Sequence, residues 1–261
     1  MSYIATCGTF PRNSFEMEQI NKKMEMTSVL IGAVLFLAAF TQSLSGFGVA
    51  LVAMALLPGL IGIKSAIPLV ALVATLVDFG VLARYWRSLQ VQKIWPLILA
   101  SFFSVPLGIL LLRRLDESLT LTILGVILAG YALYALLGLR LPELKGRLWA
   151  YAAGFLGGLL GGAYNTPGPP IIIYASCKQW EPDVFKGNLQ SFFLLNSIVV
   201  LVGHALSGNF TASIQRMFWS GLPWIAFGML AGLSMDRWVK PEVFRKIALV
   251  LLLVMGANMI L

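Results

Sequence analysis

Two polar segments that interrupt apolar runs have the residue types needed to bind an anion. Each combines side-chain donors with glycines that let the backbone approach closely: Gln42, Ser45, Gly46 and Gly48 in the first, and Asn165, Thr166 and Gly168 in the second. A half-helix that starts at such a break offers free N–H groups and about half a positive charge. We expect Asn165 and Thr166 to face Gln42 and Ser45 across a central cavity. The alternative is that these glycines and prolines only permit close helix packing.

Three further polar residues in or beside apolar runs are candidates for the same chemistry. Lys186 either attracts the anion or extends its ammonium group to the membrane interface. Asn196 either reaches the anion or bonds a neighbouring helix. Asp78 is the only carboxylate within an apolar run, and carboxylates at membrane depth are costly and usually functional. It is a candidate for proton coupling or for pairing with a basic residue, but its closeness to Arg84 equally allows an interfacial role.

The composition is that of a helical membrane protein. Hydrophobic residues make up 59% of the chain and charged residues 11%, against roughly 45–50% and about 25% in soluble domains. The apolar runs are too continuous for an outer-membrane barrel, and the chain has room for roughly six to eight helices of about 20 residues. The net charge of +8 is explained by loop Lys and Arg that orient the helices and meet anionic lipid, so nucleic acid is not an expected partner.

The sequence lacks the residue groupings of an enzyme or a metal centre. It contains one His and two Cys, and Cys7 and Cys177 stand too far apart for a metal-ligand motif. No nucleophile–base pair or His cluster supports catalysis. We therefore expect no enzymatic activity, no catalytic residues, no metal and no cofactor.

An internal duplication divides the chain into two halves. Four positions recur after a shift of 124 residues: Trp95, Gly108, Arg113 and Ser118 return as Trp219, Gly232, Arg237 and Glu242. The two breaks are related by a shift of about 120 residues. We predict a polar N-terminal tail (1–26), a first transmembrane repeat (27–139), a cytoplasmic linker (140–148) and a second repeat (149–261).

The path of the broken segments follows from length and charge. A helix over 28–58 would measure roughly 46 Å, well beyond a bilayer core of about 30 Å. If both broken segments are re-entrant hairpins, the Lys and Arg divide twelve against seven across the membrane; if both cross, they divide ten against nine. The positive-inside rule favours the unequal division. We predict an all-α fold of two inverted repeats, each with a broken re-entrant helix pair and three full spans, and both termini outside.

The motifs around the breaks resemble those of the sulfite exporter TauE/SafE family of membrane permeases. The first half carries Gln42-Ser43-Leu44-Ser45-Gly46-Phe47-Gly48, and the second a Gly-rich stretch from Gly157 to Gly162 followed by Gly168-Pro169-Pro170. Lys186 stands where the family usually has Arg, and the segment from Ala163 to Pro167 brings Tyr, Asn and Thr where members often have small residues. The resemblance implies transport of sulfite, sulfonates or thiosulfate, and we expect the Tyr-Asn-Thr segment to decide which anion.

The expected function is that of a secondary transporter in the inner (plasma) membrane. Its partners would be a small anionic substrate and the lipid bilayer. Proton coupling through Asp78 and assembly into a homo-oligomer are two further possibilities. A membrane accessory or assembly subunit and a carboxylate anion channel are the alternatives. Donors at both breaks argue against an accessory subunit, because packing alone does not need them.

Overall fold

Helices form all the regular secondary structure in the described part of the chain. The computed structural model describes residues 14–114, 116–138, 144, 146–235 and 241–260. The elements are α1 (Ser14–Ser45), α2 (Val49–Leu56), α3 (Pro58–Ile61), α4 (Ile63–Tyr85), the 3₁₀ turn η1 (Trp86–Ser88), α5 (Val91–Arg114), α6 (Glu117–Leu136), α7 (Leu148–Tyr164), α8 (Gly168–Cys177), α9 (Pro182–Leu206), α10 (Ala212–Met235) and α11 (Pro241–Ile260).

Six segments in the described ranges are helical, long and apolar enough to cross a membrane. They are Glu25–Ser45, Ile63–Ser88, Val91–Leu111, Ser118–Leu136, Pro182–Leu206 and Ala212–Met235. The predicted all-α membrane fold is thereby confirmed. The chain is already helical from Ser14, inside the segment predicted as a tail, and the predicted linker lies mostly outside the described residues.

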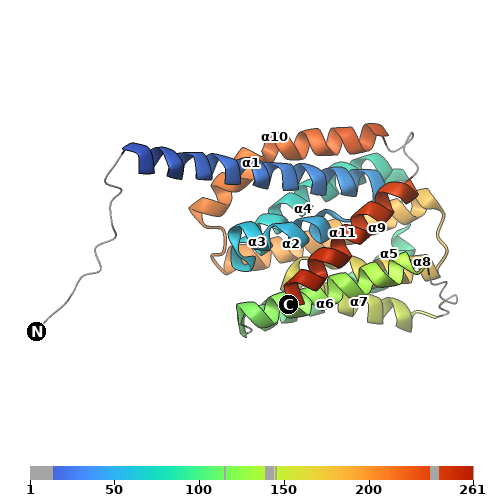
Figure 1. Cartoon of the computed structure of the whole chain (residues 1–261). Coiled ribbons are helices and arrows are strands. Elements are labelled where there is room, and N and C mark those ends of the chain that lie inside the picture. Colours follow the sequence, from blue (N-terminus) through green and yellow to red (C-terminus); the bar gives the residue numbers. More distant parts are fainter. Residues whose placement is uncertain (1–13, 115, 139–143, 145, 236–240, 261) are drawn as a thin grey trace, which may run out of the picture.

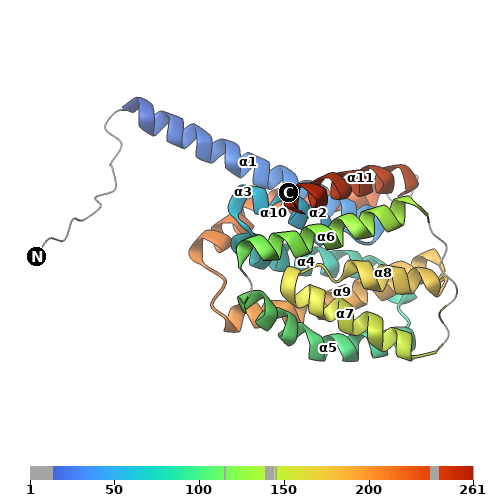
Figure 2. The ribbon, with the colours of Figure 1, turned by 60° about the horizontal axis from the view of Figure 1, so that its bottom comes forward.

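The first predicted break is present between α1 and α2. Gly46 and Gly48 have φ angles of 83° and 118°, in the left-handed region that side chains rarely adopt. The chain leaves the helix at Ser45 and enters α2 at Val49. Figures 1 and 2 show α2 and α3 turned back along α1 toward its N-terminal part, and α2 packs against α1.

The second break lies slightly earlier than the prolines that suggested it. Asn165, with a φ angle of 55°, ends α7, and the unwound residues are 165–167. Pro169 and Pro170 belong to the first turn of α8, where the missing N–H groups would have no helical partner in any case. In Figure 2, α8 lies beside α7 and turns back toward the end of the bundle where α7 begins.

Glycines bring one helix of each half into close parallel contact with a broken helix of the other half. Along α7, Gly154, Gly158 and Gly162 form a small-xxx-small series against α5. A Cβ at Gly154 would meet Leu97, and one at Gly162 would meet Val105, so the two helices run in the same direction.

The same arrangement recurs between α1 and α10. Gly221 packs on Leu35 and Gly232 on Phe40, again in parallel. If α1 corresponds to α7 and α5 to α10, the α1–α10 pair is therefore the counterpart of the α5–α7 pair.

Two helices at equivalent positions in the halves, α4 and α9, pack against each other. Lys186 contacts Tyr85 and Ser197 contacts Asp78, so α9 residue numbers rise as α4 numbers fall and the pair is antiparallel. The α6–α11 pair also joins equivalent helices. Two helix pairs, α4–α9 and α6–α11, thus join equivalent helices of the two halves. The α5–α7 contact has a matching counterpart in α1–α10. This arrangement is the one expected of two repeats related by a pseudo-two-fold axis.

Replacement of Gly162 by Ala is expected to destabilise the protein. The added methyl carbon would lie 2.2 Å from the carbonyl oxygen of Val105, so α5 and α7 must separate. Overpacking of this kind costs about 1–3 kcal/mol, measurable as a lower melting temperature in detergent. Gly130→Ala in α6 is the matched control, because its Cβ meets nothing within 4 Å and Ala favours a helix. Equal melting of the two variants would contradict this account of the α5–α7 contact.

Candidate functional site

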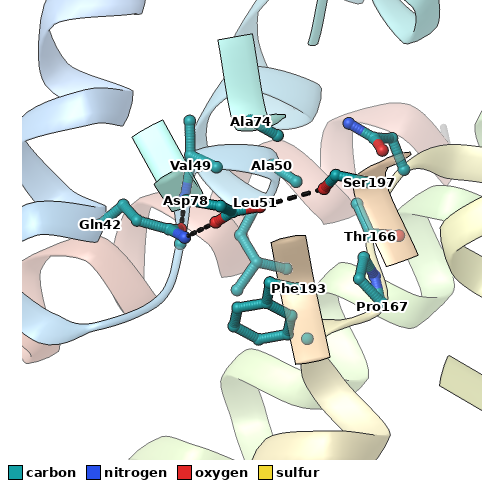
Figure 3. Close-up of a pocket in the computed structure, with 13 residues that line it drawn as sticks. Gln42, Val49, Ala50, Leu51, Ala74, Asp78, Thr166, Pro167, Phe193 and Ser197 are labelled. Atoms are coloured by element: carbon teal, nitrogen blue, oxygen red, sulfur yellow. Dashed lines mark hydrogen bonds between the residues drawn. The ribbon is translucent and has the colours of Figure 1, made fainter. Parts of the chain in front are cut away.

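A small cavity lies where the two broken segments meet. Its volume is about 30 Å³, and its lining comes from α1, α2, α4, α9, the segment that joins α7 to α8 and the first residue of α8. The lining residues are Gln42, Gly48, Val49, Ala50, Leu51, Ala74, Asp78, Asn165, Thr166, Pro167, Gly168, Phe193 and Ser197. Figure 3 shows Gln42 and Thr166 on opposite sides, with Asp78 and Ser197 between them.

The second break contributes donors that the protein leaves unused. Asn165 and Thr166 are 1% and 0% exposed, and neither the Asn165 Nδ2 nor the Thr166 Oγ1 has a hydrogen-bond partner among the described residues. The buried hydroxyl of the adjacent Tyr164 also has no hydrogen-bond partner among the described residues. Leaving a buried donor unsatisfied costs about 1–3 kcal/mol, so native proteins rarely do so without a reason. A ligand in the cavity would supply the missing acceptor.

The first break is held by a side-chain network centred on Gln42. The Gln42 Oε1 accepts a hydrogen bond of 2.8 Å from the backbone N–H of Val49, the first residue of α2. Its Nε2 donates to Asp78 and to Gln190. The Gln190 amide donates in turn to the carbonyl of Gly46, at 2.9 Å. Gln42 was predicted to bind the anion, but its amide is engaged in positioning the turn and α2.

The beginnings of both short helices lie at the cavity. In α2, Ala50 and Leu51 belong to the first turn, whose N–H groups have no carbonyl one turn earlier. In α8, Pro169 and Pro170 have no N–H, so Gly168 provides the donor there. The N-terminal ends of α2 and α8 therefore both border the cavity, with fewer free N–H groups than a glycine-rich start would give.

Asp78 brings the only carboxyl group in the cavity lining. It is 1% exposed; its Oδ1 accepts from Gln42 and its Oδ2 accepts from the Ser197 hydroxyl at 3.0 Å. Both partners are uncharged, and the described residues contain no basic group hydrogen-bonded to it. The interfacial role allowed by the sequence is therefore wrong, because Asp78 is buried among α1, α4 and α9 rather than exposed at a helix end.

Four predicted residues do not line the cavity. Ser45 donates to the carbonyls of Thr41 and Phe47, which closes the turn locally. Gly46 lies at the tip of the same turn against the Lys186 side chain.

The other two are directed elsewhere. The Lys186 Nζ donates to the Tyr85 hydroxyl at 3.3 Å and lies 5.1 Å from the centre of its ring. Asn196 accepts from Ser101 on α5 and lies beside Gly161 of α7, so it joins helices.

The sequence analysis missed Ser197 and Phe193 as lining residues. The structure gives a more exact repeat shift than the sequence did. Gly46 and Asn165 have equivalent left-handed positions 119 residues apart, and the same shift carries Asp78 to Ser197 and Ala74 to Phe193. Both pairs line the cavity, and both lie where α4 and α9 pack against each other. The described residues contain no group of three or more His, Cys, Asp or Glu able to hold a metal ion.

Comparison with known proteins agrees with this picture. A family model described as "Sulfite exporter TauE/SafE" matches residues 31–259, which includes both breaks and the whole cavity lining. The chain is also similar to a protein of Cupriavidus necator named "Probable sulfite/organosulfonate exporter TauE", with 28% identity over 253 residues, 92% of this chain and 96% of the relative. No solved structure matches the chain. The chain belongs to the sulfite exporter TauE/SafE family, and it is a multi-pass membrane transporter rather than an enzyme.

Proposed function

We propose that this protein is a secondary transporter of small sulfur-containing anions such as sulfite, sulfonates or thiosulfate, and that the anion binds in the cavity between the two breaks. The observation that carries the proposal is the pair of buried, unpartnered donors at Asn165 and Thr166. The name of the Cupriavidus relative, a probable sulfite/organosulfonate exporter, supports the substrate class.

The lining favours an anion over a cation or an uncharged solute. Asn165, Thr166 and the first turns of α2 and α8 present donors, and helix N-termini carry partial positive charge. Fixed donors can replace the hydration shell of an oxyanion without having to reorganise, whereas a cation would need acceptors. Asp78 is the one lining group whose charged form would repel an anion.

The size of the cavity favours a small substrate and a nearly closed state. A volume of about 30 Å³ holds roughly two water-sized groups. An oxyanion of four or five heavy atoms needs modest widening, and a longer sulfonate needs more. Phe193 and Leu51 give the cavity apolar walls, which suit the carbon part of an organosulfonate.

We further propose that the halves are inverted repeats that rock against each other. The antiparallel packing of α4 and α9 supports this, because a two-fold axis relating two antiparallel helices is perpendicular to both. Such an axis lies in the plane of a membrane that the helices cross. Alternating access by movement of one half around a midplane site is the mechanism of many inverted-repeat transporters. We place the protein in the inner (plasma) membrane.

The test is transport by the purified protein in lipid vesicles. Vesicles loaded with unlabelled sulfite, thiosulfate or methanesulfonate are expected to exchange their contents for the labelled anion outside, at equal pH on both sides. Saturable exchange that depends on the protein distinguishes a transporter from an accessory subunit. Flux that rises linearly with concentration would indicate the channel alternative. Absence of exchange with all three anions would overturn the proposal.

A further inference from the structure

We propose that Asp78 binds a proton together with each anion, so that anion and proton cross the membrane in the same direction. This inference rests on the proposed function, because it assigns a coupling group to the same cavity. Its basis is a juxtaposition: the carboxyl group of Asp78 lines the space that also contains the unused donors of Asn165 and Thr166.

The first step of the argument is electrostatic. An ionised Asp78 and an anion in a cavity of about 30 Å³ are close neighbours. At an effective dielectric constant of about 20, two like charges about 5 Å apart repel enough to weaken binding on the order of 10²-fold. A protonated carboxyl group removes this repulsion and adds a donor. Protonation of Asp78 thus raises the affinity for the anion, and by linkage the bound anion raises the affinity of Asp78 for its proton by the same factor.

The second step concerns where the proton would lie. Gln42 donates to the Oδ1 of Asp78, so that oxygen is best kept as an acceptor. The Oδ2 faces the Ser197 hydroxyl at 3.0 Å. When Oδ2 carries the proton, it donates to the Ser197 oxygen, and the Ser197 hydrogen becomes free to point at the anion. Ser197 also lines the cavity, so it can pass the change at Asp78 on to the substrate.

The third step is that, within the described part of the chain, no cation next to Asp78 neutralises its carboxylate in place of the proton. The groups that contact the carboxyl group, Gln42 on α1 and Ser197 on α9, are uncharged, and α2 and α3 contain no titratable residue. At about 1.5 Å per residue, Arg84 lies some 9 Å farther along α4, and His204 and Lys186 lie some 10 and 16 Å from Ser197 along α9. The remaining titratable side chains on helices packed against α4 include Glu25 on α1, Tyr131 and Tyr134 on α6 and Arg216 on α10, and none of them is hydrogen-bonded to Asp78.

Co-transport has a definite consequence for direction. A monovalent anion that moves with one proton carries no net charge, so the membrane potential does not drive it. Net flux follows the sum of the anion and proton gradients. Export then requires that the anion gradient exceed an opposing proton gradient, and an acidic exterior drives uptake.

The experiment uses labelled methanesulfonate, which stays a monovalent anion at every pH tested, unlike sulfite. Wild-type vesicles with an alkaline interior are expected to accumulate it against its gradient, and a trapped pH indicator should report acidification. Apparent affinity measured by exchange should fall at least tenfold from acidic to alkaline buffer. In Asp78→Asn the amide imitates the neutral acid, so affinity should lose its pH dependence and the pH gradient should drive neither accumulation nor proton entry.

Asp183→Asn is the matched control, because it makes the same change at an exposed position in the first turn of α9 and should behave like the wild type. Gradient-driven accumulation by Asp78→Asn would overturn the coupling proposal, and so would a pH-independent affinity in the wild type. Both outcomes leave the transporter assignment intact if equal-pH exchange persists. Loss of that exchange in the wild type would instead overturn the proposed function.

Discussion

Replacement of Thr166 by Val is expected to abolish most transport while making the protein more stable. Val matches the shape of Thr but has no hydroxyl group. Because the Thr166 Oγ1 is buried without a partner among the described residues, its removal relieves a desolvation cost of up to about 1–3 kcal/mol. The melting temperature in detergent should therefore rise.

The loss of function has a comparable energy. If the Thr166 hydroxyl donates to the bound anion, it makes a charge-assisted hydrogen bond worth about 1.5–3 kcal/mol. Its loss corresponds to roughly 10- to 100-fold weaker apparent affinity in the vesicle exchange assay. Opposite signs for stability and activity are expected of a residue kept for function at a cost to the fold.

Asn165 provides an independent version of the same experiment. Its φ angle of 55° is strained for most side chains, so a substitution by Leu would confuse donor loss with backbone strain. Asn165→Gly removes the amide and accepts the left-handed conformation at no steric cost. We expect affinity to fall by a similar factor, with little change in melting temperature.

Ser43→Ala is the control for both variants. The Ser43 hydroxyl is also buried without a partner among the described residues, but the Ser43 Cβ lies against Gly232 of α10 and the residue does not line the cavity. Its removal should raise stability and leave transport unchanged. If Thr166→Val transported like the wild type, the unused donors would have a structural origin and the proposed anion site would be wrong.

The sequence was sufficient to predict the helical membrane fold and the two breaks, because both depend on local composition. Apolar runs of about 20 residues must be helical in lipid, where backbone groups have no other partners. Glycines at 46 and 48 and prolines near 168 cannot continue a helix. The second break was placed a few residues late, since Pro169 and Pro170 are compatible with a first helical turn.

The detailed lining could not be predicted, because it depends on how side chains share hydrogen bonds. Gln42 and Asn165 are both amides beside a break, yet the Gln42 amide is hydrogen-bonded whereas the Asn165 Nδ2 has no partner among the described residues. Lys186 is close to the first turn in space but extends past Gly46 to Tyr85. Ser197 could not be found from the sequence, because the shift of 119 residues that makes it the counterpart of Asp78 is known only from the left-handed residues Gly46 and Asn165 of the structure.

Replacement of Gly168 by Leu is expected to stop transport while preserving the fold. A Cβ at Gly168 would meet only the Ile172 side chain of its own helix, at an ordinary 3.4 Å, and its φ angle is not left-handed. A side chain therefore has room at this position, and the remaining steric cost comes from Pro169, which disfavours a helical backbone at the residue before it. The residue lines a cavity of about 30 Å³, so four added carbon atoms would occupy all of it and would need the same modest widening as the substrate.

A graded series separates blocking from misfolding. Gly168→Ala should weaken exchange of methanesulfonate more than that of the smaller sulfite, and Gly168→Leu should reduce exchange of both at least tenfold, with size-exclusion profile and melting temperature close to those of the wild type. Gly130→Leu is the matched control, because its side chain would point into open space on α6. The close approach of backbone to substrate that Gly168 permits is central to the proposed site, so wild-type exchange by Gly168→Leu would exclude this cavity as the path of the anion.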